Sequence, residues 1–328
     1  ALEENLHMSR LAAALGIVAV ATTVFVAAQA PAVSTIALPA SITFPEGVAY
    51  DAAADVAYTA SAVTGLVVRV NLKTGTSETV APAGTLLAPG APAPFPAVLG
   101  MKLDAAHRLW IAGGATGRMW ILDTRTGKVL KDFQVPNPSG SLINDVALVG
   151  NAGYFTDTRF ATLWRIQITG TQIGALEPFV MFANTPLQYD SAANLNGIAA
   201  TADGKSLIVV QMGKGLLFRV DLATKAVTAI DTAGQDLSGA DGLVLDGHTL
   251  YVVRQTAVEI ATVQLTADYS KGTVVNRLKD PLLAWPATAA KVGDRLIVVN
   301  TQFNTRGDNS QKTPFTLASV PLARLTAR

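Results

Sequence analysis

Four residues with oxygen-bearing side chains stand at the same place in four segments of similar sequence. They are Glu46 in PEGVAYD, Asn144 in INDVALV, Asn196 in LNGIAAT and Asp241 in ADGLVLD. Carboxylate and amide oxygens suit a hard divalent cation. Two carboxylates brought together without such an ion would repel each other, and one would take up a proton. The pattern therefore predicts a shared metal site, with calcium favoured and magnesium, manganese or zinc as alternatives.

The same dipeptides also have an ordinary structural explanation. Asn196-Gly197 and Asp241-Gly242 are common sequences in hairpin turns. The polar residues, however, fall at one position of a repeat, ahead of an apolar strand pattern rather than between two strands. This shared phase favours a common site over independent turns.

The repeat that carries these residues predicts the fold. Equivalent positions recur 45–53 residues apart at Glu46, Leu99, Asn144, Asn196, Asp241 and Ala287. This spacing is typical of a four-stranded propeller blade. Apolar β-branched residues alternate with smaller or polar ones, and no long helical period follows the apolar N-terminal run. The sequence predicts an all-β protein, a six-bladed β-propeller with four-stranded blades, formed by residues 33–328 as one domain.

The two ends of this region supply the strand that should close the ring. The sequence TIAL at residues 35–38 precedes the first repeat, and FTLASV at residues 315–320 follows the last. We expect the N-terminal strand to complete the last blade, because a closed ring leaves no open blade at the joint.

Composition excludes several function classes. The chain has 328 residues, 50% of them hydrophobic, a net charge of +1 and no cysteine. The absence of cysteine excludes a disulfide framework, a Cys-ligated zinc site and a Cys nucleophile. Basic residues form no stripe, so nucleic acid is not an expected partner. A small-molecule substrate is the expected partner, and the protein is expected to be a monomer.

The N-terminal residues are expected to lie outside the fold. Residues 1–7 precede Met8-Ser9-Arg10, which resembles a natural start, so they are interpreted as the remnant of an expression tag. In residues 8–32, one Arg precedes a long apolar run that ends in small residues, as in a secretory signal peptide. An uncleaved membrane anchor is the alternative. The mature protein is expected to be secreted or periplasmic, without attachment to the membrane after cleavage.

Other catalytic patterns are missing from the sequence. It contains neither G-x-S-x-G nor H-E-x-x-H. His107 in DAAHRL and His248 in LDGHTL are predicted to be solvated hairpin residues, which makes them poor general bases.

The motifs PEG, IND, NG and ADG, in this order, resemble the regucalcin/gluconolactonase-like family of six-bladed propellers, from about Thr35 onward. The resemblance implies that Glu46, Asn196 and Asp241 bind the metal, that Asn144 is a further ligand or a substrate contact, and that Asp241 is the general base.

One position departs from the family pattern. Family members that hydrolyse sugar lactones often have an arginine two residues before the asparagine of the third blade, where this chain has Leu142. The Ala- and Pro-rich residues 81–96 and the loop 184–194 are expected to form much of the mouth. All three features favour a less polar substrate.

Three functions remain open at this point. The leading hypothesis is a secreted metal-dependent hydrolase of a lactone or related ester, in which the cation polarises the carbonyl and activates water and Asp241 accepts a proton. The alternatives are a condensing enzyme that resembles strictosidine synthase, with Glu46 as its acid/base, and a non-enzymatic binding propeller with a structural metal. Further candidate contacts with the substrate, besides Asn144, are Gln211, Arg254, Trp285 and Asn300.

Overall fold

The computed structural model describes residues 31–87 and 98–326 of the chain. Pro31–Arg328 form one compact unit. The expected tag and almost the whole of the expected signal peptide (residues 8–32) lie outside the described residues. In the described part, no helix has the length and apolar character needed to cross a membrane.

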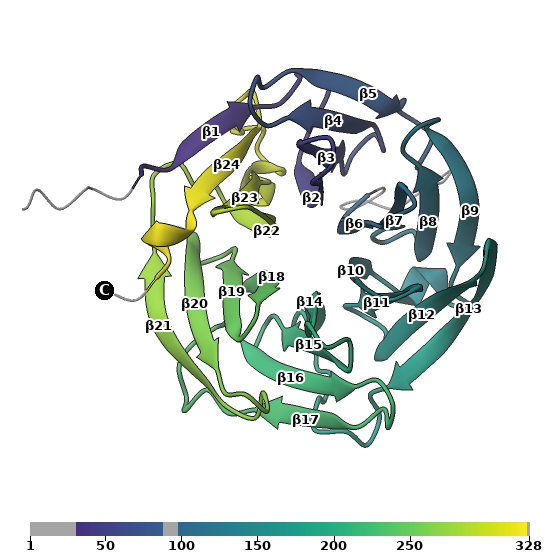
Figure 1. The fold of residues 1–328 in the computed structure, drawn as a ribbon, viewed down its shortest axis with the longest axis vertical. Helices are drawn as coiled ribbons and strands as arrows, with labels where there is room; N and C mark the ends of the chain where they lie inside the picture. Colours follow the sequence, from purple (N-terminus) through teal and green to yellow (C-terminus); the bar gives the residue numbers. More distant parts are fainter. Residues whose placement is uncertain (1–30, 88–97, 327–328) are drawn as a thin grey trace, which may run out of the picture. The chain divides into compact units, whose positions relative to one another are not determined.

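Six four-stranded antiparallel sheets form a ring around a central axis (Figure 1). The described residues otherwise form only three short 3-10 helices, η1 (Pro138–Gly140), η2 (Phe303–Thr305) and η3 (Leu322–Arg324). This architecture confirms the predicted all-β, six-bladed propeller with four-stranded blades.

In five blades the strands run outward from the axis in sequence order, and in the last blade the N-terminal strand lies outermost (Figure 1). The innermost strands are β2 (Pro45–Asp51), β6 (Met101–Leu103), β10 (Ile143–Val149), β14 (Leu195–Ala200), β18 (Ala240–Asp246) and β22 (Pro286–Val292). The second strands are β3 (Val56–Ser61), β7 (Arg108–Ala112), β11 (Ala152–Asp157), β15 (Ser206–Gln211), β19 (Thr249–Arg254) and β23 (Arg295–Asn300). The third strands are β4 (Val67–Asn71), β8 (Arg118–Asp123), β12 (Thr162–Thr169), β16 (Leu216–Asp221), β20 (Glu259–Leu265) and β24 (Thr316–Pro321). The outermost strands are β5 (Ser77–Ala81), β9 (Lys128–Gln134), β13 (Gln172–Met181), β17 (Val227–Ile230), β21 (Gly272–Leu278) and, in the last blade, β1 (Ser34–Ala37).

The N-terminal strand closes the ring, as predicted. β1 pairs antiparallel with β24, in a register that runs from Ser34 opposite Ser319 to Ala37 opposite Thr316. The segment that follows β1 is anchored by Leu38 and Ile42, which are 3% and 1% exposed. Both ends of the propeller therefore contribute to one blade, and separating them would expose apolar surface.

The core lies between neighbouring blades. Trp110 of the second blade and Phe155 of the third belong to one buried cluster, and Leu163 of the third blade and Phe218 of the fourth belong to another. Each blade buries both of its faces, which is why its central strands consist largely of Val, Ile, Leu and Phe. Burial of one such side chain contributes about 1.5–3 kcal/mol, so the interfaces between blades hold the ring rigidly.

The innermost strands share an irregularity at their first residues. Five of the six have a register shift there, between Pro45 and Val48, Ile143 and Val146, Leu195 and Ile198, Ala240 and Leu243, and Pro286 and Ala289. A β-bulge inserts an extra residue and redirects the neighbouring side chains. In each of the five strands, the bulge contains the residue at the repeat position identified from the sequence.

Glycine after the bulged residue lets neighbouring blades approach each other closely. A Cβ on Gly47 would lie 2.3 Å from the carbonyl oxygen of Leu99, and one on Gly197 would lie 2.1 Å from that of Asp241. Any larger residue would push these backbones apart. The Gly of the NG motif thus has a packing role that a hairpin turn would not require.

Candidate functional site

A cavity of about 190 Å³ lies where the innermost strands begin. Its lining includes all four predicted residues with oxygen ligands, Glu46, Asn144, Asn196 and Asp241. The tertiary structure thus brings together four residues that are far apart in the chain. The rest of the wall is mostly apolar and includes Leu99, Leu142, Met212 and Phe303.

Asn144 presents its carbonyl oxygen without a protein partner. Its Nδ2 donates a hydrogen bond of 3.0 Å to Thr158 Oγ1, which in turn donates one of 2.7 Å to the carbonyl oxygen of Leu195. This chain of bonds fixes the amide. Within the described residues, Asn144 Oδ1 is buried and accepts no hydrogen bond, so this oxygen is available to a ligand.

Glu46 is a buried carboxyl group in unfavourable surroundings. The side chain is 4% exposed, and Oε2 accepts no hydrogen bond from the described part of the chain. Burial, followed by the nearby charges of Asp241 and Asp145, raises the pKa of Glu46 well above its usual value. An isolated buried carboxylate is costly, so the group is either protonated or neutralised by a cation.

Asp241 is a second buried carboxyl group with a raised pKa, and it accepts a hydrogen bond from Gln255. Burial and the charge of Asp145 raise the pKa of Asp241 to about 8, against the opposing effects of Asn196 and Gln255. Gln255 Nε2 donates a hydrogen bond to Asp241 Oδ2 and fixes the carboxylate against the wall. Asn196 Nδ2 donates to Met212 Sδ at 3.2 Å. Asp241 therefore faces the cavity in a fixed orientation.

The donor set fits a divalent cation. Among the described residues, no group of three or more His, Cys, Asp or Glu side chains could hold a metal ion. The axial set is of a different kind, with two carboxylates and two amides, which are the oxygen ligands that calcium and magnesium accept. The buried acceptors Glu46 Oε2 and Asn144 Oδ1 have no partner in the described structure. A cation would satisfy both and offset the charge of Glu46 and Asp241.

Asp145 is a third buried carboxyl group near the axis. It occupies the position of Gly47 and Gly197 in the repeat, and its Oδ1 lies 3.8 Å from the ammonium nitrogen of Lys102. Burial raises the pKa of Asp145, while Lys102 opposes that effect. Asp145 does not line the axial cavity and acts on its carboxyl groups through charge.

The four other predicted substrate contacts do not line the cavity. Gln211 Nε2 donates to the carbonyl oxygen of Gln188 and to Asn194 Oδ1. Asn300 Nδ2 donates to the carbonyl oxygen of Leu282 and to Thr316 Oγ1.

The side chains of Arg254 and Trp285 also lie elsewhere. The Arg254 guanidinium is 7% exposed and forms ion pairs with Asp236 and Glu259 at 2.6 and 2.5 Å. Trp285 is half-buried and precedes β22 with a φ of 48°. The structure therefore groups these four residues with the loops that lead into the innermost strands.

Gln211, Arg254 and Asn300 belong to a second set of residues at equivalent positions of the repeat. This set anchors the loops that lead into the innermost strands. In five of the six blades, the second strand ends in a polar residue. These residues are Ser61, Asp157, Gln211, Arg254 and Asn300. Asp157 Oδ1, for example, accepts hydrogen bonds from the backbone N–H groups of Leu142, Arg159 and Phe160. The set holds the segments that lead into five of the six innermost strands and so positions the cavity residues.

Sequence reasoning missed the residues that follow this set. Thr158, Met212 and Gln255 each come directly after a second strand, and all three line the cavity. The same repeat phase that identified Glu46 would have identified them. Leu142 also lines the cavity, so the residue at the family's arginine position contributes an apolar surface here.

The predicted mouth is only partly described. Residues 88–97 of the Ala- and Pro-rich segment lie outside the described residues. Of the loop 184–194, Ala193 lines the cavity, while the hydroxyl of Tyr189 donates a hydrogen bond of 2.6 Å to the carbonyl oxygen of Asp157. Both predicted hairpin histidines lie in turns, with His248 exposed and His107 half-exposed at a φ of 60°.

Fold and cavity together define a six-bladed β-propeller with a polar site at one end of its channel. No family model and no curated protein sequence matches this chain. A calcium-binding protein, regucalcin, from Agrobacterium tumefaciens is 16% identical with a TM-score of 0.61, over 88% of this chain and 95% of that one. A gluconolactonase from Xanthomonas campestris is 16% identical with a TM-score of 0.60, over 88% of each chain. Virginiamycin B lyase from Staphylococcus aureus is 14% identical with a TM-score of 0.58, over 89% of this chain and 99% of that one.

These likenesses show the fold. Regucalcin and gluconolactonase are among the solved propellers similar to this chain, as the motifs indicated. One neighbour is named a lyase, and one fold supports many chemistries, so the function must be argued from the site itself.

Proposed function

We propose that this protein is a metal-dependent hydrolase of a lactone or related ester. Glu46, Asn144, Asn196 and Asp241 would hold the cation, with calcium favoured. The observation that carries the proposal is the pair of buried acceptors, Glu46 Oε2 and Asn144 Oδ1, which have no partner in the described structure and face one cavity. Buried polar atoms of this kind need a partner, and a bound ion is one that also offsets the charge of the carboxylates.

The chemistry follows from the residues around the cavity. A bound divalent cation would polarise an ester carbonyl and lower the pKa of a bound water. Asp241, which Gln255 orients, accepts the proton from the attacking water. No side chain needs to become acylated, which agrees with the absence of a Ser or Cys nucleophile motif in the sequence.

The apolar wall selects the substrate. Leu99, Leu142, Met212 and Phe303 present carbon and sulfur where a sugar acid would need hydrogen-bond partners. A hydroxyl buried there without a partner would weaken binding by about 1–3 kcal/mol. An alkyl-substituted lactone or ester therefore fits better than a polyhydroxylated one.

Elemental mass spectrometry tests the metal site first. We would compare the protein from Val33 onward with its Glu46→Gln/Asp241→Asn variant, each dialysed against calcium. One calcium per chain in the unmodified protein alone supports the site. The two proteins are then assayed on alkyl and polyhydroxylated lactones, with and without chelator. Lactone hydrolysis that survives both the chelator and the double substitution would exclude this mechanism.

The condensing enzyme remains a second candidate because of Glu46. Its pKa is raised, and it shares a cavity with Leu99 and Phe303, which would suit an acid/base that acts on an amine and an aldehyde. Condensation that is insensitive to chelator and lost in Glu46→Gln would favour this function. A cation that binds without turnover of either substrate class would favour a binding protein with a structural metal.

The proposal includes export and a monomeric state. Residues 8–32 have the pattern of a signal peptide. N-terminal sequencing of the chain expressed from Met8 in a bacterial host, together with fractionation, tests export. Cleavage near Ala30 or Ala32 and recovery outside the cytoplasm would support it, and an intact chain in the cytoplasm would contradict it. Light scattering at several concentrations tests the monomer.

A further inference from the structure

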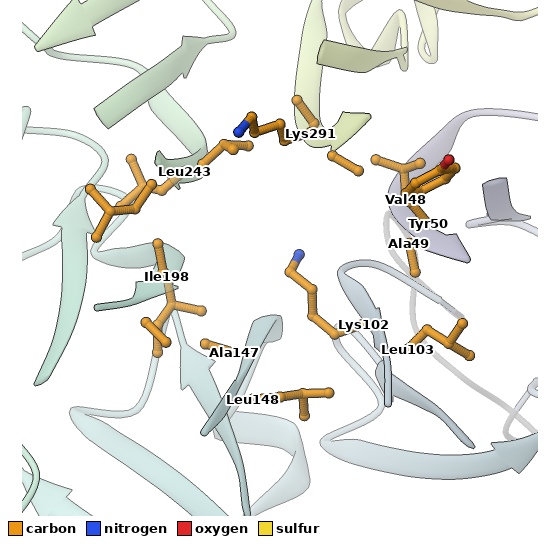
Figure 2. A pocket seen from close by; sticks show the side chains of 16 residues that line it. Val48, Ala49, Tyr50, Lys102, Leu103, Ala147, Leu148, Ile198, Leu243 and Lys291 are labelled. Atoms are coloured by element: carbon orange, nitrogen blue, oxygen red, sulfur yellow. The ribbon is translucent and has the colours of Figure 1, made fainter. Parts of the chain in front are cut away.

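A second cavity of about 300 Å³ lies farther along the same innermost strands (Figure 2). It is built by all six blades, and no residue that lines it also lines the axial cavity. Its lining includes the apolar residues Val48, Leu148, Ile198 and Leu243 and two lysines, Lys102 and Lys291. Nothing in the function proposed above uses this second cavity.

Lys102 points its charge into the cavity. Figure 2 shows its side chain extending from the strand toward the middle of the ring of lining residues. Its ammonium donates a hydrogen bond of 3.3 Å to the carbonyl oxygen of Met101 and forms a long ion pair with Asp145, whose Oδ1 lies 3.8 Å away and accepts no hydrogen bond from it. An ammonium has three donors. Two of them therefore have no acceptor among the described residues.

Lys291 has a different position. It runs along the wall in Figure 2, and its ammonium forms an ion pair of 2.7 Å with Asp246. The side chain of Lys291 is 37% exposed and that of Lys102 is 29% exposed. Lys291 is therefore a matched control for Lys102, because it has the same charge at the same cavity with its partner already in place.

The remaining wall combines apolar side chains with the backbone edges of the innermost strands, and its larger apolar side chains are Val48, Leu103, Leu148, Ile198, Leu243 and Leu245. Each innermost strand ends its sheet, so within that sheet only one side is hydrogen-bonded and the other faces the channel. These edges carry further N–H donors between apolar side chains. A volume of about 300 Å³ is at the lower end of the range for ligand pockets, enough for one small molecule.

We propose that this second cavity binds a small carboxylate with a short apolar chain, and that Lys102 binds its carboxylate group. The two available donors of Lys102 supply the charge-assisted hydrogen bonds, and the aliphatic walls enclose the chain. The site is separate from the proposed metal centre, so it stands whether or not the hydrolase proposal holds.

Calorimetric titration with octanoate tests the site, with octanamide as the uncharged counterpart. We expect one octanoate per chain and weaker binding of octanamide. Lys102→Met should weaken octanoate binding about tenfold or more, since a hydrogen bond to a charged group contributes about 1.5–3 kcal/mol. Lys102→Arg should retain most of the affinity. Lys291→Met and Glu46→Gln/Asp241→Asn should change it by less than about threefold.

The absence of saturable octanoate binding, or an unchanged affinity in Lys102→Met, would overturn the proposal. Loss of binding in Glu46→Gln/Asp241→Asn would also overturn it, because it would place octanoate in the axial cavity. If Lys102→Met does not fold, the rate of lysine acetylation in the unmodified protein, measured with and without octanoate, tests the site instead. Octanoate should slow the acetylation of Lys102 and leave that of the exposed Lys128 unchanged. Equal rates at Lys102 with and without octanoate would refute the site.

Discussion

Stability in the absence of metal should fall as the pH rises, and Asp241 should be a main cause. Its pKa is raised from 3.8 to about 8 in the folded protein, chiefly by burial. Between these values the folded protein retains a proton that the unfolded chain has released. The free energy of unfolding therefore decreases with increasing pH across this window, the opposite of the usual behaviour of a carboxyl group in an ion pair.

The size of the effect follows from the shift. One pKa unit corresponds to about 1.4 kcal/mol, so three units between pH 5 and pH 8 correspond to a loss of about 4 kcal/mol. Glu46 lies in the same cavity and titrates together with Asp241, so the loss belongs to the pair. Asp241→Asn removes one of the two titrating groups and should make the loss smaller, while the part due to the burial of Glu46 remains.

Urea unfolding in chelator at pH 5 and pH 8 measures this effect. The unmodified protein should lose several kcal/mol at the higher pH, and Asp241→Asn much less. Asp294→Asn, at an exposed carboxylate, is the matched control and should follow the unmodified protein. Calcium should restore stability at pH 8 in the unmodified protein and not in Asp241→Asn, because binding to the folded state alone stabilises it. Superimposable pH profiles for the unmodified protein and Asp241→Asn would refute the reasoning.

Three further predictions concern the structures that support the site. Gly197→Ala should destabilise the protein by about 1–3 kcal/mol in thermal unfolding, because the added Cβ would lie 2.1 Å from the Asp241 carbonyl oxygen. Gly307→Ala, with open space around it, is the control and should be neutral. Equal melting temperatures for the two variants would contradict the packing argument. Gln255→Leu should weaken calcium binding about 10–100-fold by releasing Asp241, measured by calorimetry, and unchanged affinity would show that this hydrogen bond does not orient the ligand. A chain that begins at Thr43 lacks β1 and the buried Leu38 and Ile42, so it should lose about 3–6 kcal/mol in urea unfolding; undiminished stability would show that β1 does not close the ring.

The repeat in the sequence determined much of the architecture. Alternating apolar residues and turn signals are local properties, and their recurrence every 45–53 residues was sufficient to predict six four-stranded blades. Ring closure by residues near Thr35 followed from the two unpaired strand patterns at the chain ends. The phase of the repeat also placed Glu46, Asn144, Asn196 and Asp241 in one cavity, because equivalent positions of a propeller meet at its axis.

The partners of polar side chains at the ends of the second strands could not be predicted in this way. Gln211, Arg254 and Asn300 were expected to contact the substrate, yet their polar groups are engaged by the loops that enter the innermost strands. The pairing of Arg254 with Asp236 depends on which loop lies nearby, and no local pattern records that. The sequence marks these positions as polar, but only the packed structure decides whether a polar group faces a cavity or a backbone carbonyl.

The sequence by itself therefore determined the blades, their closure and the identity of the four polar residues that meet in the axial cavity. Only the tertiary structure decided the electrostatics of the channel. Asp145 replaces a glycine of the repeat and lies buried beside Lys102 of the neighbouring blade, and Lys102 in turn enters a second cavity made by all six blades. Periodicity specifies which residues are equivalent, whereas charge, burial and cavity shape arise from contacts between residues that are not equivalent.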